Sequence, residues 1–211
     1  MWLSQPAYYA GYEEEARRAH DRLVELDPSK DGAEPWINIE KTDGLEDNFD
    51  HVLAQLSAPL PSKRLYGLFL LGKTAHRQAI LTHAHHIDFD DFVPIEQLYF
   101  VYALDKKFVE DHDEDDPQLR SIEVAEQLYT AYAPLEERGD LILRQWFSFL
   151  VLAYGVRYAF RNPSAIAAAF DYNQNAQLEK VTKKQFAEKY GTTVPTLTKY
   201  LKQLLEIYRH R

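Results

Sequence analysis

The chain has 211 residues, of which 45% are hydrophobic and 27% are charged, and its formal net charge is −9. This composition is that of a globular protein and excludes disordered, fibrous and collagen-like classes, while the negative charge argues against a protein coated in nucleic acid. The chain contains no cysteine, which excludes disulfides, thiolate metal sites and cysteine nucleophiles.

Helices are predicted along the first half of the chain. Scarce glycine and abundant tyrosine favour packed helices over a turn-rich sandwich or barrel. Apolar residues from Tyr8 to Leu26 recur every three or four positions, which predicts an amphipathic helix that ends before Pro28. Further helices are expected at residues 45–56, 62–84 and 94–109, and a brief alternation at 35–39 indicates a short extended piece.

The second half of the chain completes an all-α fold. A helix is expected at residues 118–135, and residues 141–160 are apolar on almost every face, as in a helix at the centre of a bundle. A short alanine-rich helix follows up to residue 170, and the polar stretch 171–178 resembles a linker. The sequence therefore predicts a helical bundle around the buried helix at about 141–160, with a helix pair at the C-terminus.

Charge divides the chain into two parts. Residues 180–211 hold eight basic side chains against two acidic ones, a net charge of +6, which leaves −15 for residues 1–179. We expect an acidic helical bundle at 1–172 and a basic module at 179–211, or alternatively one continuous domain in which the module packs on the bundle. A basic module on an acidic body indicates an end that faces a polyanion, although lysine is also a good exposed helix former.

The C-terminal residues 181–204 contain the most informative pattern. Thr182 is placed to cap one helix and Thr193 to cap the next, with Pro195 in the first turn of the second. Gly191 stands between them, where the chain needs a left-handed residue. The inward residues of the two helices are Phe186, Ala187, Tyr190, Leu197, Tyr200, Leu201 and Leu204.

This segment resembles the helix-turn-helix family of DNA-binding proteins. The resemblance rests on the small residue Ala187 where the helices cross, on Gly191 four positions later, and on the apolar pattern around them. One departure is Thr192, which follows the glycine where the family usually has an aliphatic residue. The phrase from Gly191 to Leu201 is similar to the turn and recognition-helix start of many bacterial regulators.

The resemblance implies that the second helix lies in the major groove of DNA. Its exposed face would then carry Thr193, Pro195, Thr196, Thr198, Lys199 and Lys202. Lysines of the first helix, Lys183, Lys184 and Lys189, would contact phosphates. The expected function is a DNA-binding regulator that acts as a homodimer, with an N-terminal region for sensing or dimerisation. The alternative is a helical protein–protein interaction module without DNA affinity.

A second alternative is a metal-dependent enzyme that uses the region from His76 to Asp91. The weak metal candidates are His83, His85, His86 and Asp88. Their spacing does not put three ligands on one helix face, so a polar helix end that runs into a loop is the favoured interpretation. No P-loop, dinucleotide-binding glycine pattern or nucleophile elbow is present, so the sequence predicts no cofactor and no catalytic residue.

A cytoplasmic protein is expected. The N-terminal residues lack a basic segment followed by an apolar one, so no signal peptide is predicted. The most apolar segment, 141–160, carries Arg144, Gln145 and Arg157, and its uninterrupted apolar part is far shorter than the roughly 20 residues of a membrane span.

Overall fold

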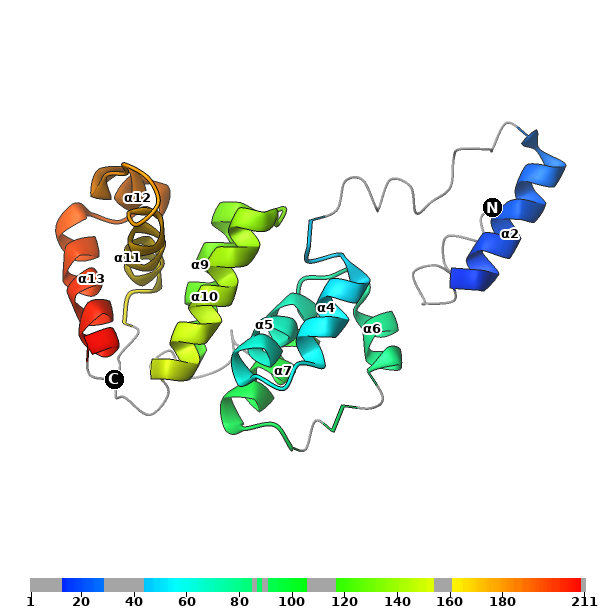
Figure 1. The fold of residues 1–211 in the computed structure, drawn as a ribbon, viewed down its shortest axis with the longest axis horizontal. Coiled ribbons are helices and arrows are strands. Elements are labelled where there is room, and N and C mark those ends of the chain that lie inside the picture. The colour runs from blue at the N-terminus through cyan, green and yellow to red at the C-terminus, as the bar shows by residue number, and fades with distance from the viewer. Residues whose placement is uncertain are drawn as a thin grey trace.

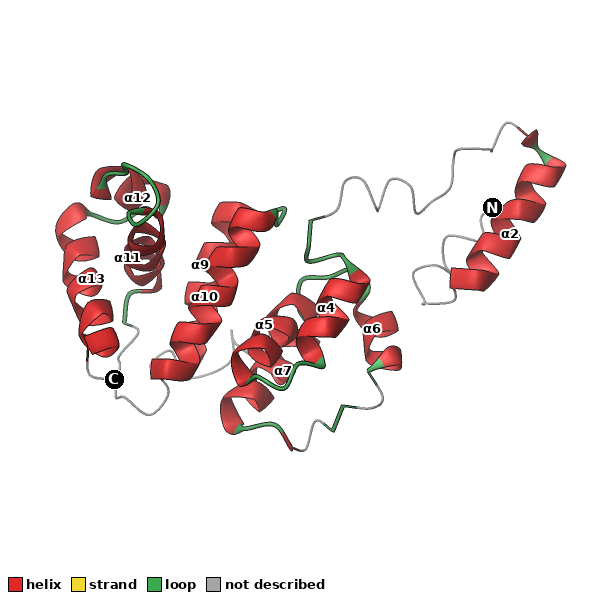
Figure 2. Ribbon diagram, in the orientation of Figure 1, coloured by secondary structure: helices red, strands yellow, loops and turns green. Residues whose placement is uncertain are grey.

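The computed structural model describes residues 13–28, 44–84, 87–88, 91–105, 117–153 and 161–209. Every regular element within these residues is a helix, so the predicted all-α class is confirmed (Figures 1 and 2). In the same part of the chain, no helix combines the length and the apolar character that crossing a bilayer requires. The extended piece expected at 35–39 lies outside the described residues.

The first described helices are α2 (Glu13–Leu26), α4 (Phe49–Leu56), α5 (Pro61–Leu71), α6 (Arg77–His83) and α7 (Pro94–Leu104). The side chain of Asn48 caps α4 by accepting a 2.9 Å bond from the backbone of His51. Pro61 opens α5, where its missing N–H group leaves no bond unmade. Helices α4 and α5 pack on each other, and α5 packs on α7.

The single helix expected at 62–84 is in fact two helices. Helix α5 ends at Leu71 with Gly72 as its C-cap, and the chain turns before α6 begins at Arg77. Glycine has a low helix propensity, and α7 lies close to this point, since a Cβ atom on Gly72 would lie 3.3 Å from the Cα atom of Ala103. Periodicity alone did not reveal the break because apolar residues continue on both sides of it.

We call the described helices from α4 to α10 the bundle, that is, α4, α5, α6, α7, α9 (Pro117–Tyr132) and α10 (Glu137–Ala153). Large aromatic side chains fill its core. The ring of Phe147 lies 5.8, 5.6 and 5.5 Å from those of Tyr66, Phe69 and Tyr99. Helix α10 contacts α5, α9 and α11. It coincides with the apolar helix expected at 141–160 as far as Ala153, and residues 154–160 lie outside the described part.

Three helices form the C-terminal unit, α11 (Pro163–Asn175), α12 (Lys183–Lys189) and α13 (Val194–Arg209). Helix α11 contacts α12 and α13, and on its other side it contacts α9 of the bundle (Figure 1). The linker expected at 171–178 is therefore wrong, because α11 continues to Asn175 and the side chain of Asp171 is fully buried. Two of the polar residues in this stretch, Asp171 and Asn175, are buried and hydrogen-bonded inside the protein, which composition alone does not reveal.

Candidate nucleic-acid interface

The turn between α12 and α13 has the geometry that the sequence predicts. Gly191 adopts a φ of 62°, in the left-handed region that favours glycine. The N–H of Gly191 donates to the carbonyl of Glu188 at 3.2 Å, and that of Thr192 donates to the carbonyl of Ala187 at 2.8 Å. These two bonds form a Schellman motif. The threonine at 192 uses only its backbone in this motif, so the departure from the family pattern leaves the turn intact.

Both helices begin at the expected caps. The hydroxyl of Thr182 accepts from the N–H of Gln185 at 3.4 Å, and the Gln185 side chain accepts from the N–H of Thr182 at 2.8 Å, which completes a capping box. Thr193 caps α13 through its side chain, since its hydroxyl accepts from the N–H of Thr196 at 3.4 Å. The inward residues predicted for the two helices are all buried: Phe186, Ala187, Tyr190, Leu197, Tyr200, Leu201 and Leu204.

The predicted contact residues of α13 lie on its outer side and fall into two groups that differ in exposure. Pro195, Lys199 and Lys202 are exposed, and so is the capping residue Thr193. Thr196 and Thr198 are only half-exposed and are already hydrogen-bonded. The hydroxyl of Thr196 lies 2.8 Å from that of Thr193, and the hydroxyl of Thr198 accepts from Nζ of Lys183 at 3.3 Å.

The three predicted phosphate contacts on α12 have different surroundings. The side chain of Lys184 is 78% exposed and lies 3.8 Å from Glu188, and Lys183 is half-exposed and reaches across to α13. Lys189 is exposed along part of its side chain, but its ammonium is paired with a buried carboxylate. Its ammonium lies 3.0 Å from Oδ2 of Asp171 and 3.7 Å from the centre of the Tyr132 ring. Of these three lysines, Lys183 and Lys184 are therefore placed at the candidate interface, whereas the ammonium of Lys189 is not.

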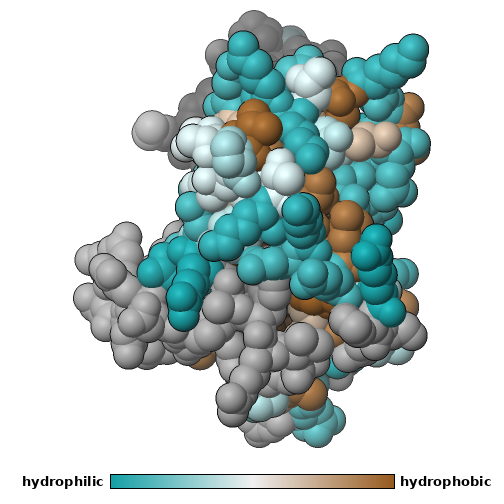
Figure 3. All heavy atoms as spheres, turned by 90° about the vertical axis from the view of Figure 1, so that its left-hand side faces the viewer, coloured by the Kyte–Doolittle hydropathy of each residue, from teal (hydrophilic) through white to brown (hydrophobic). Residues whose placement is uncertain are grey.

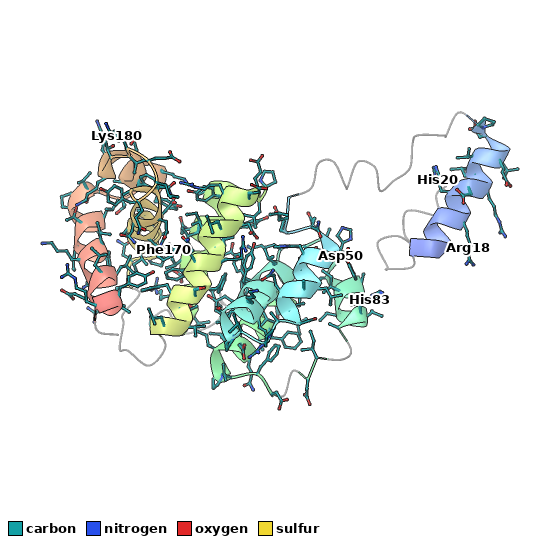
Figure 4. All side chains as sticks on the ribbon, viewed as in Figure 1. Arg18, His20, Asp50, His83, Phe170 and Lys180 are labelled. Carbon is teal, nitrogen blue, oxygen red and sulfur yellow. The ribbon has the colours of Figure 1, made fainter. Side chains whose placement is uncertain are left out.

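The surface of the C-terminal unit is largely hydrophilic. Figure 3 views the molecule from this side, where hydrophilic side chains cover most of the described surface and a strip of hydrophobic ones runs between them. Lys180 lies at the tip of the unit beside α12, whereas Phe170 lies within it (Figure 4). The ring of Phe170 lies 5.3 Å from that of Trp146, which joins α11 to α10 of the bundle.

Asp171 is a buried residue that the sequence analysis missed. Its carboxylate accepts bonds from the hydroxyl of Tyr132 at 2.7 Å, from that of Tyr190 at 2.7 Å, and from the Asn175 amide at 2.6 Å. Burial, together with the negative charge of Asp171, raises the pKa of Tyr190 and of Tyr132 above the usual value. The one available signal was the spacing of Asp171 and Asn175, four positions apart on one helix face.

A second buried carboxylate, Asp140, lies in the bundle. It accepts from the Tyr66 hydroxyl at 2.7 Å, and Nε2 of His51 and the Arg144 guanidinium lie 3.0 and 2.6 Å from it. Burial alone would raise the pKa of Asp140, but the close contact with His51, the hydrogen bond from Tyr66 and the charge of Arg144 hold it below its usual value. These contacts join α4, α5 and α10.

The histidine-rich region shows no metal-binding arrangement in its described part. Nδ1 of His83 lies 2.9 Å from the carbonyl of Ala79, and the His83 ring packs edge-on against Phe49 at 5.1 Å. Asp88 is exposed, whereas His85 and His86 lie outside the described residues. Among the residues that are described, no three His, Asp or Glu side chains are placed to hold a metal ion. Helix α6, which carries His83, is far from α12 and α13 (Figure 4).

The geometry of α12 and α13 agrees with the helix-turn-helix resemblance at the caps, the turn and the buried face. The chain matches no family model, no curated protein and no solved structure. Membership of the helix-turn-helix family therefore stays a prediction that rests on residues 181–204 and on the geometry of these two helices.

Proposed function

We propose that the protein binds double-stranded DNA through its C-terminal unit and acts as a transcriptional regulator. The observation that carries the proposal is the pairing of α12 with α13 across the Gly191 turn. Packing of α13 on α11 and α12 buries one face of α13 and leaves Pro195, Lys199 and Lys202 exposed on the other. The major groove of DNA admits one α-helix, and α13 presents a basic side suited to it.

Each exposed group has a defined role in this proposal. Lys199 and Lys202 project from α13 and donate to phosphates or to guanine, while Thr193 and Thr196 lie in the first turn, where recognition helices contact base edges. Lys183 and Lys184 at the start of α12 contact phosphates, which orient the protein without reading sequence. Lys189 has no such role, because its ammonium is paired with Asp171.

The charge distribution supports binding through this unit alone. Residues 180–211 carry a net charge of +6, whereas residues 1–179 carry −15 and are repelled by DNA phosphates. A single helix-turn-helix unit covers a short site, and specific binding by such units commonly uses two copies on two half-sites. The proposal therefore includes a homodimer and assigns sensing or dimerisation to the helices before α11.

The first test reverses the charge of Lys199. Lys199→Glu should change the free energy of unfolding by less than about 0.5 kcal/mol, because the residue is exposed on a helix. DNA affinity should nevertheless fall roughly tenfold or more at low salt, since attraction to phosphate becomes repulsion. Fluorescence anisotropy with random and genomic duplexes at two salt concentrations measures this effect.

The matched control for this test is Lys63→Glu. Lys63 is an exposed lysine on α5, in the bundle, so the substitution makes the same change in net charge far from α13. Loss of affinity in Lys199→Glu alone supports the assignment of α13. Equal affinities in both variants and the wild type would reject it. A wild-type protein that binds no duplex would favour the protein–protein interaction module instead.

A further inference from the structure

The contacts of Asp171 cross the boundary between the bundle and the C-terminal unit. We define the Asp171 junction as Tyr132, Asp171, Asn175, Lys189 and Tyr190. Tyr132 belongs to α9 of the bundle, Asp171 and Asn175 belong to α11, and Lys189 and Tyr190 belong to the end of α12. Three helices therefore meet at one carboxylate, and all four of its side-chain partners donate to it.

Tyr132 supports both members of the ion pair between Asp171 and Lys189. Its hydroxyl donates to Oδ1 of Asp171 at 2.7 Å, while the face of its ring lies 3.7 Å from the Lys189 ammonium. A cation this close to an aromatic face is attracted by the ring quadrupole, more strongly where water is partly excluded. Asp171 is fully buried and the Lys189 side chain is 32% exposed, so the ion pair is only partly screened.

The position of α12 depends on this junction because α12 is short. It has seven residues, and its last turn is held through Lys189 and Tyr190. Its first turn carries Lys183 and Lys184, the proposed phosphate contacts, and Lys183 also donates to Thr198 on α13. Movement of the last turn of α12 therefore shifts these lysines relative to Lys199 and Lys202.

We infer that the Asp171 junction is a positioning device through which α9 sets the pose of α12 and hence the DNA affinity of the C-terminal unit. The inference rests on the proposed function and specifies how the binding site is regulated. Tyr132 acts through Asp171 and Lys189 and does not itself contact DNA. Any change in the bundle that displaces the end of α9 is transmitted to the phosphate-binding lysines of α12.

The chain offers a closely matched pair of variants for the test. Tyr132→Phe removes the hydroxyl that bonds to Asp171 and keeps the ring beneath Lys189. Tyr129→Phe is the control on the same helix. Its hydroxyl donates to Oε1 of the buried Glu46 at 3.1 Å, and its ring lies 4.8 Å from the Lys73 ammonium. Both substitutions thus remove a hydroxyl bond to a buried carboxylate beside a lysine, but only one reaches the C-terminal unit.

Two measurements on the full chain separate positioning from stability. DNA affinity is measured by anisotropy well below the unfolding temperature, and amide hydrogen exchange is measured in residues 183–189. Tyr132→Phe should weaken DNA binding roughly three- to tenfold, the range expected for one lost hydrogen bond, and should accelerate exchange in α12. The salt dependence of binding should also become shallower, because phosphate contacts from α12 are lost. Tyr129→Phe should leave all three quantities close to those of the wild type.

Each outcome of the test is decisive. Equal losses of DNA affinity in the two variants, or no loss in either, would overturn the inference while the proposed function stands. A wild-type protein without DNA affinity would overturn the proposed function and the regulatory part of the inference. Hydrogen exchange would then still decide whether Tyr132 positions α12, since faster exchange in Tyr132→Phe alone supports positioning and unchanged exchange rejects it.

Discussion

The bundle and the C-terminal unit are both helical, but they are held together by different side chains. The bundle core contains Tyr66, Tyr99 and Phe147, all fully buried, whereas α11 buries the small residues at 165 and 167–169. Small side chains let neighbouring helices approach closely and leave little apolar volume to stabilise them. The C-terminal unit also buries larger apolar side chains, among them Phe170, Phe186 and Leu197. Close helix approach along α11 therefore adds to ordinary apolar packing and does not replace it.

Each region contains a buried aspartate to which tyrosine donates, and the two differ in what they connect. Asp140 joins α4, α5 and α10, all within the bundle, and its cation Arg144 lies on its own helix and is 45% exposed. Asp171 joins α9 of the bundle to α11 and α12, and its cation comes from another helix. A buried aspartate bonded to tyrosine thus stabilises one region at Asp140 and connects two regions at Asp171.

The largest expected effects come from removing these carboxylates. Asp171→Ala should lower the free energy of unfolding by about 3–5 kcal/mol, because it leaves the hydroxyls of Tyr190 and Tyr132 and the amide of Asn175 without their shared acceptor. Asp140→Ala should lower it by only about 2–3 kcal/mol, since the half-exposed Arg144 regains water. Urea unfolding followed by circular dichroism measures both values. A larger loss in Asp140→Ala would contradict this ranking.

The pH dependence of stability should be alike in the two regions. Burial and a nearby aspartate raise the pKa of Tyr66 in the bundle and of Tyr190 in the C-terminal unit. The folded protein therefore favours the neutral tyrosines. Their contribution to the free energy of unfolding is complete below about pH 10, the pKa of tyrosine in the unfolded chain, and it declines above that pH. Each such tyrosine should reduce the free energy of unfolding by up to about 1.4 kcal/mol per pH unit above pH 10.

Substitution of either tyrosine tests this expectation. Tyr66→Phe and Tyr190→Phe should each make the decline above pH 10 shallower, as measured by urea unfolding at several pH values. A decline that stays the same in both variants would show that other groups cause the alkaline loss of stability. A change in only one variant would show that the two regions differ in their response to pH.

The smallest expected effect concerns the backbone of the C-terminal unit. Gly191→Ala should lower the free energy of unfolding by about 1 kcal/mol, because φ is positive there and a side chain is strained. A Cβ atom at this position would meet nothing within 4 Å, so the loss comes from the backbone and not from a clash. Gly191→Asn should lose less, since asparagine tolerates this conformation. Equal thermal unfolding temperatures for the two variants would contradict a backbone origin.

The sequence predicts local features of the C-terminal unit well. Caps at Thr182 and Thr193, the left-handed Gly191 and the buried faces of α12 and α13 all follow from short-range rules about helix ends and periodicity. These features depend on residues within a few positions of one another, so a single chain segment contains the information. The prediction for α11 stopped at residue 170, whereas the helix continues to Asn175, because its last turn is polar in composition.

Features that depend on distant contacts were not predicted. The pairing of Lys189 with Asp171 and Tyr132 joins three separate helices, and nothing in the local pattern distinguishes Lys189 from the exposed Lys184. The break between α5 and α6 also depends on tertiary structure, because α7 approaches the chain at Gly72. The sequence therefore predicts which residues line α13, but not which lysine on α12 is paired with a buried carboxylate.

The pairing of two lysines with carboxylates also affects how the protein meets a charged partner in solution. Lys73 is 8% exposed and its ammonium is paired with Glu126, and Lys189 is paired with Asp171, so neither cation offsets the acidic surface of the body. The other described cations of residues 180–209 belong to the C-terminal unit, which lies at one end of the molecule (Figure 1). Residues 180–211 carry a net charge of +6, against −15 for residues 1–179. In the field of a polyanion, the molecule rotates during diffusion so that this end arrives first. A larger fraction of encounters is then correctly oriented, and the association rate falls as salt is added.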